Sequence, residues 1–133
     1  METTISIDGL RWRMRVDGDS AGAPLLLLHG FTGCIAFWDD VVEKMGSRVK
    51  TIRVDLPGHG ASDAPVDVTY YTMESVSRSL AQMLDRLAID RADVWGYSMG
   101  GRLALLFALE YPGRINRLVL ESASPGLADP NER

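Results

Sequence analysis

The chain has 133 residues, of which 46% are hydrophobic and 24% charged, as is typical of one soluble globular domain with a buried core. Its formal net charge of −4 and its scattered basic residues argue against nucleic acid as a partner. A single cysteine, a polar N-terminus and the lack of any long apolar run exclude an internal disulfide, a signal peptide and a membrane span, so we expect a cytoplasmic protein.

The first part of the chain predicts an antiparallel hairpin and then a buried strand. Apolar and polar residues alternate in residues 5–7 and 12–16, around an Asp-Gly turn, which indicates a hairpin with one wet face. Residues 25–28 are four leucines, a pattern typical of a strand that is covered on both faces. A glycine-rich loop at 29–33 follows, and an amphipathic helix is expected around 37–45.

A second strand and loop repeat this arrangement. Residues 49–54 predict a strand, and the sequence Asp-Leu-Pro-Gly-His-Gly at 55–60 predicts a loop. Thr72 is a favourable N-cap, and apolar residues then recur at helical spacing as far as Leu87. We therefore expect a helix that starts at Thr72 and lies on the sheet with one face.

The most specific local pattern is a serine flanked by glycines two positions away on either side. Residues 92–95 predict the end of a buried strand, residues 96–100 read Gly-Tyr-Ser-Met-Gly, and residues 103–109 are almost entirely apolar. A serine on such a strand-to-helix turn is held out at the top of the sheet, at the positive end of a helix. The alternative is an ordinary glycine-rich turn with a solvent-exposed serine.

The last strand is predicted at 115–120, and residues 122–133 are expected to form a loop. Strands that alternate with helices imply a parallel sheet with helices on both faces, here entered through the antiparallel hairpin. Each glycine-rich loop follows a strand. All of these loops are therefore expected at the carboxyl edge of the sheet, where open α/β sheets place their sites.

These motifs, in this order, resemble the α/β-hydrolase superfamily across essentially the whole chain, residues 1–133. The resemblance rests on His29-Gly30-Phe31, on residues 55–63, on the Gly-Tyr-Ser-Met-Gly-Gly sequence at 96–101 and on Leu118-Val119-Leu120. It implies an α/β-hydrolase fold in a single domain.

Within the superfamily, residues 96–102 and 121–127 resemble one branch, the 2-succinyl-6-hydroxy-2,4-cyclohexadiene-1-carboxylate synthases of menaquinone biosynthesis. This resemblance implies abstraction of a proton from a carboxylated cyclohexene substrate, followed by elimination of pyruvate. Two further functions stay open. One is a serine esterase or a carbon–carbon bond hydrolase of the same fold, and the other is a non-catalytic domain that assembles with another chain.

The superfamily fold has an eight-stranded sheet with a helical cap after the sixth strand, whereas six strands are predicted here. The triad acid and histidine of the family follow later strands and have no counterpart in this sequence. We therefore expect a fold truncated after about six strands, without cap or last strands, and a chain that is inactive alone. The strand at 115–120 would then be an apolar edge, so we expect a homo-oligomer or pairing through this strand.

The resemblance assigns roles to five residues. Ser98 is the catalytic serine, and the backbone N–H groups of Phe31 and Met99 form the oxyanion hole. Arg102 lies one helical turn beyond Ser98 and anchors a substrate carboxylate, although a surface arginine is the alternative. Tyr97 either binds substrate or packs. The substrate is expected to be a small carboxylated molecule, with no metal, other cofactor, nucleic acid or membrane involved.

Four other polar residues lie on the same edge of the predicted sheet. His29 and His59 both follow strands, so either is a candidate base for Ser98. The resemblance instead gives His29 a role in shaping the oxyanion loop and His59 a role in bracing a turn. Asp55 and Asp63 are candidate acids, but loop aspartates commonly cap turns.

Overall fold

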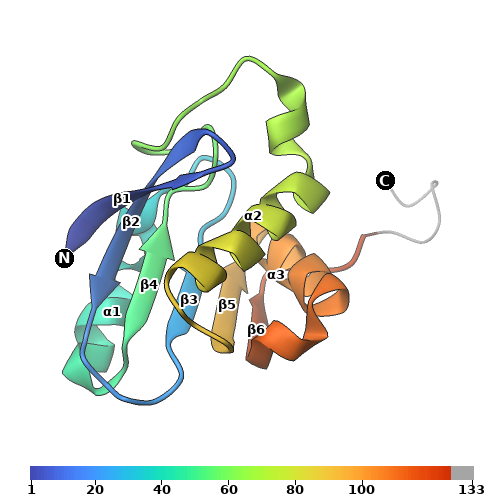
Figure 1. The fold of residues 1–133 in the computed structure, drawn as a ribbon. Helices are drawn as coiled ribbons and strands as arrows, with labels where there is room; N and C mark the ends of the chain where they lie inside the picture. Colours follow the sequence, from blue (N-terminus) through green and yellow to red (C-terminus); the bar gives the residue numbers. More distant parts are fainter. Residues whose placement is uncertain (127–133) are drawn as a thin grey trace.

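The computed structural model describes residues 1–126, which form one six-stranded sheet with helices on both faces (Figure 1). The strands are β1 (Glu2–Ile7), β2 (Leu10–Asp17), β3 (Leu25–Leu28), β4 (Thr51–Val54), β5 (Ala92–Tyr97) and β6 (Ile115–Glu121). The α-helices are α1 (Asp39–Met45), α2 (Met73–Arg86) and α3 (Met99–Glu110). Short 3-10 helices are η1 (Ile35–Trp38), η2 (Gly46–Arg48), η3 (Val68–Tyr71) and η4 (Pro112–Arg114).

The strand order is β1-β2-β4-β3-β5-β6. β2 pairs antiparallel with β1 and β4, whereas β3 pairs parallel with β4 and β5, and β5 pairs parallel with β6. The prediction of a parallel sheet entered through an antiparallel hairpin is therefore confirmed. No helix within residues 1–126 is long and apolar enough to cross a membrane.

Local capping explains where the second helix starts. The Oγ1 atom of Thr72 accepts a hydrogen bond of 3.1 Å from the N–H of Ser75, so α2 begins at the predicted N-cap. The sequence did not predict η3, which lies in the preceding polar loop. There the Asp67 carboxylate accepts a hydrogen bond from the N–H of Thr69 at 3.0 Å. Because this bond, and no periodic pattern of apolar residues, starts the short helix, the hydrophobic pattern of the sequence does not reveal it.

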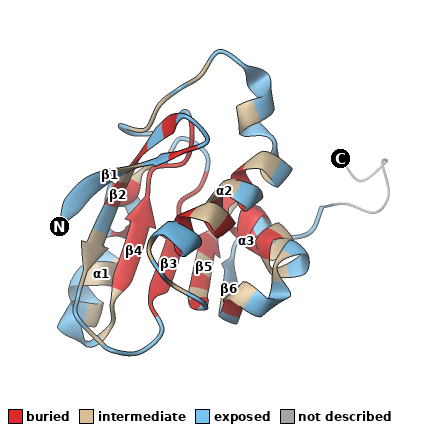
Figure 2. Cartoon of the chain, in the orientation of Figure 1, coloured by how far each residue is buried: buried red, intermediate tan, exposed pale blue. Residues whose placement is uncertain are grey.

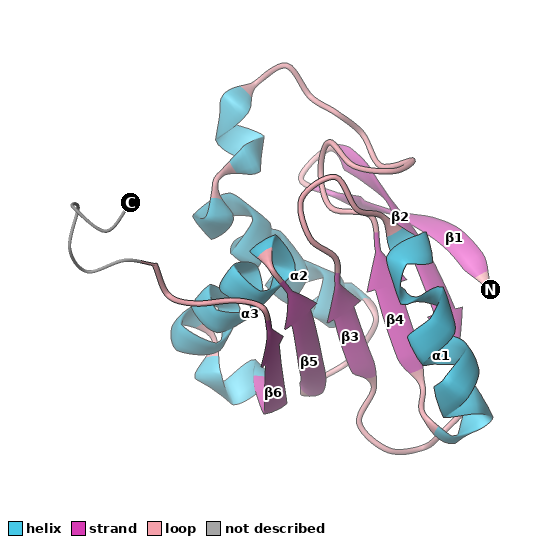
Figure 3. Cartoon of the chain, turned by 180° about the vertical axis from the view of Figure 1, so that it is seen from behind, coloured by secondary structure: helices cyan, strands magenta, loops and turns pink. Residues whose placement is uncertain are grey.

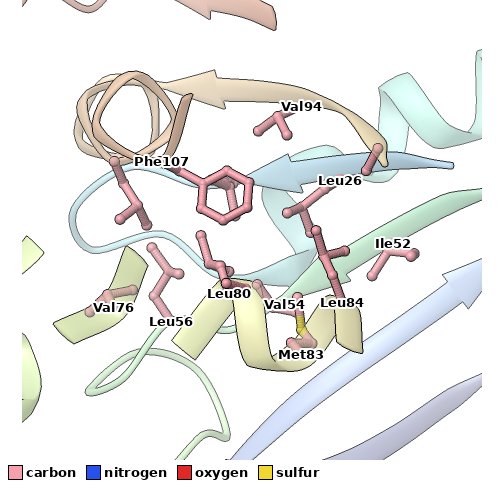
Figure 4. Close-up of a cluster of buried hydrophobic side chains, with 14 of the residues drawn as sticks. Leu26, Ile52, Val54, Leu56, Val76, Leu80, Met83, Leu84, Val94 and Phe107 are labelled. Atoms are coloured by element: carbon pink, nitrogen blue, oxygen red, sulfur yellow. The ribbon is translucent and has the colours of Figure 1, made fainter. Parts of the chain in front are cut away.

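The four leucines of β3 divide between two layers. Leu26 and Leu28 belong to the larger core, which α2 and α3 cover, whereas Leu25 and Leu27 pack with Trp38 and the apolar side of α1. Figure 4 shows the larger core, where side chains from the sheet meet side chains from both helices. Successive side chains of β3 are thus buried on both faces of the sheet, as the run of four leucines predicts.

The two faces of the sheet are covered unequally. Seen from behind, α1 lies in front of the strands near β4, whereas no helix lies in front of β5 and β6 (Figure 3). β6 is one edge of the sheet and is mostly exposed, in contrast to β3 and β4 (Figure 2). On this barely covered face Trp95 pairs in register with Val119, which is 47% exposed.

Candidate active site

Ser98 lies between β5 and α3 in a backbone conformation that residues with a side chain rarely adopt, with φ of 52° and ψ of −113°. The neighbouring glycines make this turn possible. A Cβ atom on Gly96 would lie 2.2 Å from the carbonyl oxygen of Gly100, and one on Gly100 would lie 2.2 Å from that of Leu28. Only glycine fits at either position, because a Cβ atom would collide with backbone atoms.

The loop after β3 contacts the same turn. A Cβ atom on Gly30 would lie 3.4 Å from the Cβ of Ser98 and 3.0 Å from the ring of Tyr97. Phe31 follows this glycine, and Met99 is the first residue of α3, where the N–H has no acceptor inside the helix. Within residues 1–126 neither the N–H of Phe31 nor that of Met99 has a hydrogen-bond partner. Two unused amide donors therefore flank Ser98, one on the loop after β3 and one at the start of α3.

A cleft of ≈ 470 Å³ opens at Ser98. Its lining residues are Met73, Ser98, Met99, Arg102, Ser122, Ala123 and Ser124. The N–H of Arg102 donates to the carbonyl oxygen of Ser98 at 3.1 Å, which places the arginine one helical turn from the serine. Its side chain is exposed and forms no ion pair within the described part of the chain. A hydroxyl and an unpaired guanidinium thus share one cleft.

Sequence reasoning did not propose the hydroxyls of Ser122 and Ser124 as site residues. Both lie directly after β6 and line the cleft. Only their position in the sequence could have indicated them, because the carboxyl end of β6 lies on the same edge of the sheet as Ser98. The rest of the predicted tail, residues 127–133, lies outside the described residues.

A second hollow of ≈ 200 Å³ adjoins the cleft and is mostly apolar. It is lined by Phe31, Leu56, Pro57, His59, Tyr71, Met73, Val76, Met99 and Leu103. Met73 and Met99 line both spaces, so the two meet beside the first turn of α3. Together they offer a compartment of mixed polarity at the Ser98 hydroxyl and an apolar compartment beside it.

His29 is fully buried, and both of its ring nitrogens are used. Nδ1 lies 2.7 Å from the carbonyl oxygen of Gly30, and Nε2 accepts from the N–H of Leu56 at 3.1 Å. These partners require a neutral ring with its proton on Nδ1. Burial lowers the pKa of His29, which keeps the imidazole uncharged. The ring therefore joins two loops and has no nitrogen left for Ser98.

His59 points into the apolar hollow and is absent from the lining of the serine cleft. Its Nδ1 lies 3.1 Å from the carbonyl oxygen of Pro57, and its ring centre lies 4.9 Å from that of His29. No side chain within residues 1–126 hydrogen-bonds the Oγ of Ser98. The described residues thus present a hydroxyl and amide donors without a base in contact.

The two candidate acids hold loops together. Asp55 is fully buried and accepts from the N–H of Ile35 at 2.7 Å and of Ala61 at 2.9 Å. Asp63 accepts from the N–H of Arg11 at 2.8 Å. Both carboxylates therefore bind backbone N–H groups, as the alternative of turn capping predicts, and neither lines the serine cleft.

Tyr97 lies on the other side of the turn. Its ring stacks on Phe37 with ring centres 4.7 Å apart and packs with the cluster under α1. Tyr97 does not line the serine cleft, so the structure places its ring in packing contacts. Cys34 is half-buried at the start of η1. Within residues 1–126 no three His, Cys, Asp or Glu side chains are grouped as a metal site requires.

Comparison with known proteins places these features in a family. The sequence model of the alpha/beta hydrolase fold matches residues 23–132. A Bacillus subtilis protein provisionally named 2-succinyl-6-hydroxy-2,4-cyclohexadiene-1-carboxylate synthase is 40% identical over 95% of this chain and 46% of its own length. The pimeloyl-[acyl-carrier protein] methyl ester esterase of Nitrosomonas europaea is 36% identical over 84% of this chain and 42% of its own length.

Among solved structures, a hydrolase from Pseudomonas aeruginosa PA01 superimposes with a TM-score of 0.88 at 30% identity. The match covers 98% of this chain and 49% of that hydrolase. The chain thus spans about half the length of the relatives that it matches.

The contact between α3 and β3 predicts the effect of enlarging a glycine. Gly100→Ala should lower the free energy of unfolding by about 1–3 kcal/mol, because its new methyl group would collide with the backbone of Leu28. Gly113→Ala is the matched control, since a Cβ atom there meets nothing within 4 Å. Urea denaturation of both variants tests this, and equal stabilities would contradict the proposed backbone contact.

Burial of His29 predicts that stability depends on pH. Because folding lowers the pKa of His29 from 6.5, only the unfolded chain takes up this proton just below that pH. The free energy of unfolding should therefore fall as pH drops from 7.5 to 5.5, by up to about 1.4 kcal/mol per pH unit. The carboxyl groups with lowered pKa values, Glu2, Asp17 and Asp67, titrate at lower pH.

The assignment to one histidine is tested with variants. Urea denaturation at several pH values should show a flatter slope for His29→Asn, whose residue 29 no longer titrates. His59→Gln is the control and should keep the slope, since His29 is still present. A slope that survives in His29→Asn would show that another group causes the pH dependence.

Proposed function

Because the chain belongs to the alpha/beta hydrolase family, we propose that it supplies the serine, the oxyanion donors and a substrate anchor of an enzyme site. The proposed reaction is that of the synthase branch, in which a proton is abstracted from a carboxylated cyclohexene and pyruvate is eliminated. The similarity to the Bacillus subtilis protein over nearly the whole chain supports this choice over other members of the family.

One observation carries the proposal: Arg102 and Ser98 line the same cleft, and the arginine has no acidic partner within residues 1–126. A planar guanidinium binds a carboxylate with two parallel hydrogen bonds. Placed one helical turn from the serine, it would hold a carboxylated substrate with its reacting carbon near Oγ. In this proposal Tyr97 has a packing role only.

The two amide donors would act on the charge that develops during reaction. Removal of a proton next to a carbonyl group moves negative charge onto the carbonyl oxygen, which the N–H groups of Phe31 and Met99 would stabilise. A donor of this kind typically contributes about 2.7–4 kcal/mol to the transition state. The positive end of α3 acts in the same direction.

Ser98 needs a partner to take its proton, since a serine hydroxyl at neutral pH is a poor base and a poor nucleophile. Both ring nitrogens of His29 are occupied, and His59 lines the apolar hollow. In the proposed site the base therefore comes from outside residues 1–126. A site without its base retains only a small residual activity.

An esterase is the second candidate function. The apolar hollow beside Phe31 and Met99 could accept the hydrocarbon part of an ester whose carbonyl oxygen binds the same amides. The similarity to an esterase of Nitrosomonas europaea supports this alternative. The two candidates differ in the substrate that they turn over, so a direct comparison of substrates separates them.

The isolated chain should turn over less than roughly one thousandth as fast as the same residues completed with a base. The comparison uses a chimera in which residues 1–126 replace the matching segment of the Bacillus subtilis relative. Both proteins are assayed with the synthase substrate and with p-nitrophenyl butyrate. If the chimera turns over the synthase substrate faster, the site is that of a synthase. If it turns over p-nitrophenyl butyrate faster, the site is that of an esterase.

Ser98→Ala in the chimera is the control and should remove activity toward both substrates. Circular dichroism establishes that each protein is folded before it is assayed. Near-equal rates for the isolated chain and the chimera would contradict the proposal that the base comes from outside residues 1–126. A folded chimera without activity would instead favour the non-catalytic domain.

Arg102→Gln should weaken binding of succinate to the 133-residue chain about tenfold or more, because a hydrogen bond to a charged group contributes about 1.5–3 kcal/mol. Binding of the neutral dimethyl succinate should not change. NMR titration of the isolated chain measures both affinities without requiring turnover. Arg78→Gln, an exposed arginine on α2, is the matched control, and equal losses for both ligands would exclude Arg102 as a carboxylate anchor.

A further inference from the structure

The loop after β3 closes into a tight turn over residues 30–33. The N–H of Gly33 donates to the carbonyl oxygen of Gly30 at 2.9 Å, which is the hydrogen bond that closes a four-residue β-turn. Thr32, the third residue of this turn, has a φ of 65°. A β-branched residue is strained at positive φ, so the surrounding structure has to hold the turn closed.

A second donor holds the same carbonyl group. Nδ1 of His29 lies 2.7 Å from the Gly30 oxygen and donates its proton to it, because a carbonyl oxygen can only accept. The two donors thus use both lone pairs of that oxygen. The His29 ring is fully buried, so turning the carbonyl group away would leave a buried N–H without an acceptor and would also open the turn. The direction of the Gly30 carbonyl group is therefore fixed by two hydrogen bonds.

The fixed carbonyl group also determines where the next amide points. The carbonyl of Gly30 and the N–H of Phe31 belong to one trans peptide, in which they point in opposite directions. The His29 ring lies on the β4 side of β3, because its Nε2 accepts from the N–H of Leu56, which follows β4. β5, which leads to Ser98, is the neighbour of β3 on the other side. The N–H of Phe31 is therefore directed to the side on which Ser98 lies.

Gly33 has no room for a side chain. A Cβ atom there would lie 2.9 Å from the carbonyl oxygen of Gly30 and 3.2 Å from Nδ1 of His29. At the first of these distances an atom has to shift, and a carbonyl oxygen shifts only together with its planar peptide. We propose that Gly33 is a positioning residue, which leaves room for both bonds to the carbonyl group and so keeps the Phe31 N–H aimed at Ser98. This inference rests on the proposed function, in which that N–H is an oxyanion donor.

The direction of the amide is measured in the 133-residue chain without any turnover. Gly33→Ala should change the residual dipolar coupling of the Phe31 N–H, because the new methyl group moves the peptide that carries it. The couplings of β3, β4 and β5 should not change, which shows that the sheet is intact. Gly113→Ala is the matched control and should leave the Phe31 coupling as it is, since a Cβ atom there meets nothing within 4 Å. An unchanged Phe31 coupling in folded Gly33→Ala would overturn the proposal.

Measurements on the natural chain test the same turn if Gly33→Ala does not fold. The N–H of Gly33 should exchange with D2O at least roughly tenfold more slowly than the N–H of Phe31, which has no acceptor within residues 1–126. A scalar coupling across the hydrogen bond should join the Gly33 nitrogen to the carbonyl carbon of Gly30. A missing coupling, or a Phe31 N–H as protected as that of Gly33, would overturn the proposal.

The catalytic consequence is tested in the chimera with the Bacillus subtilis relative. Gly33→Ala should lower kcat by roughly tenfold to a hundredfold for the substrate that the chimera turns over faster, and KM should stay nearly unchanged. The reason is that a misdirected donor loses its effect mainly in the transition state. Gly113→Ala is again the control and should change neither constant.

The outcomes separate this inference from the proposed function. An unchanged kcat in a folded Gly33→Ala chimera would overturn the positioning role while the proposed function stands. If the chimera with Gly33 is itself folded and inactive, the proposed function fails. The dipolar couplings of the isolated chain then decide whether Gly33 directs the Phe31 N–H.

Discussion

The close approach of α3 to the end of β3 is the constraint on which the site depends. With no side chain at Gly100, the first turn of α3 lies against the carbonyl oxygen of Leu28. This contact brings together the loop after β3, which carries Phe31, and the turn that carries Ser98. The glycines of the motif thus set the distance between backbone segments. The hydroxyl and the amide donors become neighbours because their backbones touch.

Buried polar groups keep the surrounding loops in place. The imidazole of His29 links the loop after β3 to the loop after β4, and the carboxylate of Asp55 links that second loop to η1. Each bond satisfies a buried group that would otherwise be costly to remove from water. These residues are therefore committed to structure. A histidine or an aspartate near a catalytic serine is not by itself evidence of a triad.

Much of the fold could be predicted from the sequence, because it depends on periodicity and on glycine. The leucines of β3 and the N-cap at Thr72 each have one simple physical explanation. The directions of single side chains could not be predicted in this way. Whether Tyr97 faces the cleft or α1 depends on the pleat of β5 and on the position of Phe37, which is far away in the sequence. That Ser122 and Ser124 line the cleft likewise depends on where β6 ends.

The positive φ of Ser98 separates the demands of folding from those of chemistry. Glycine is the residue with the least strain in this backbone conformation, so selection for stability alone would favour glycine in place of Ser98. The serine side chain at this position lowers the free energy of unfolding relative to glycine. Under the proposed function, the reaction is thus what keeps a side chain at residue 98, whereas the buried residues beneath it are kept by packing alone.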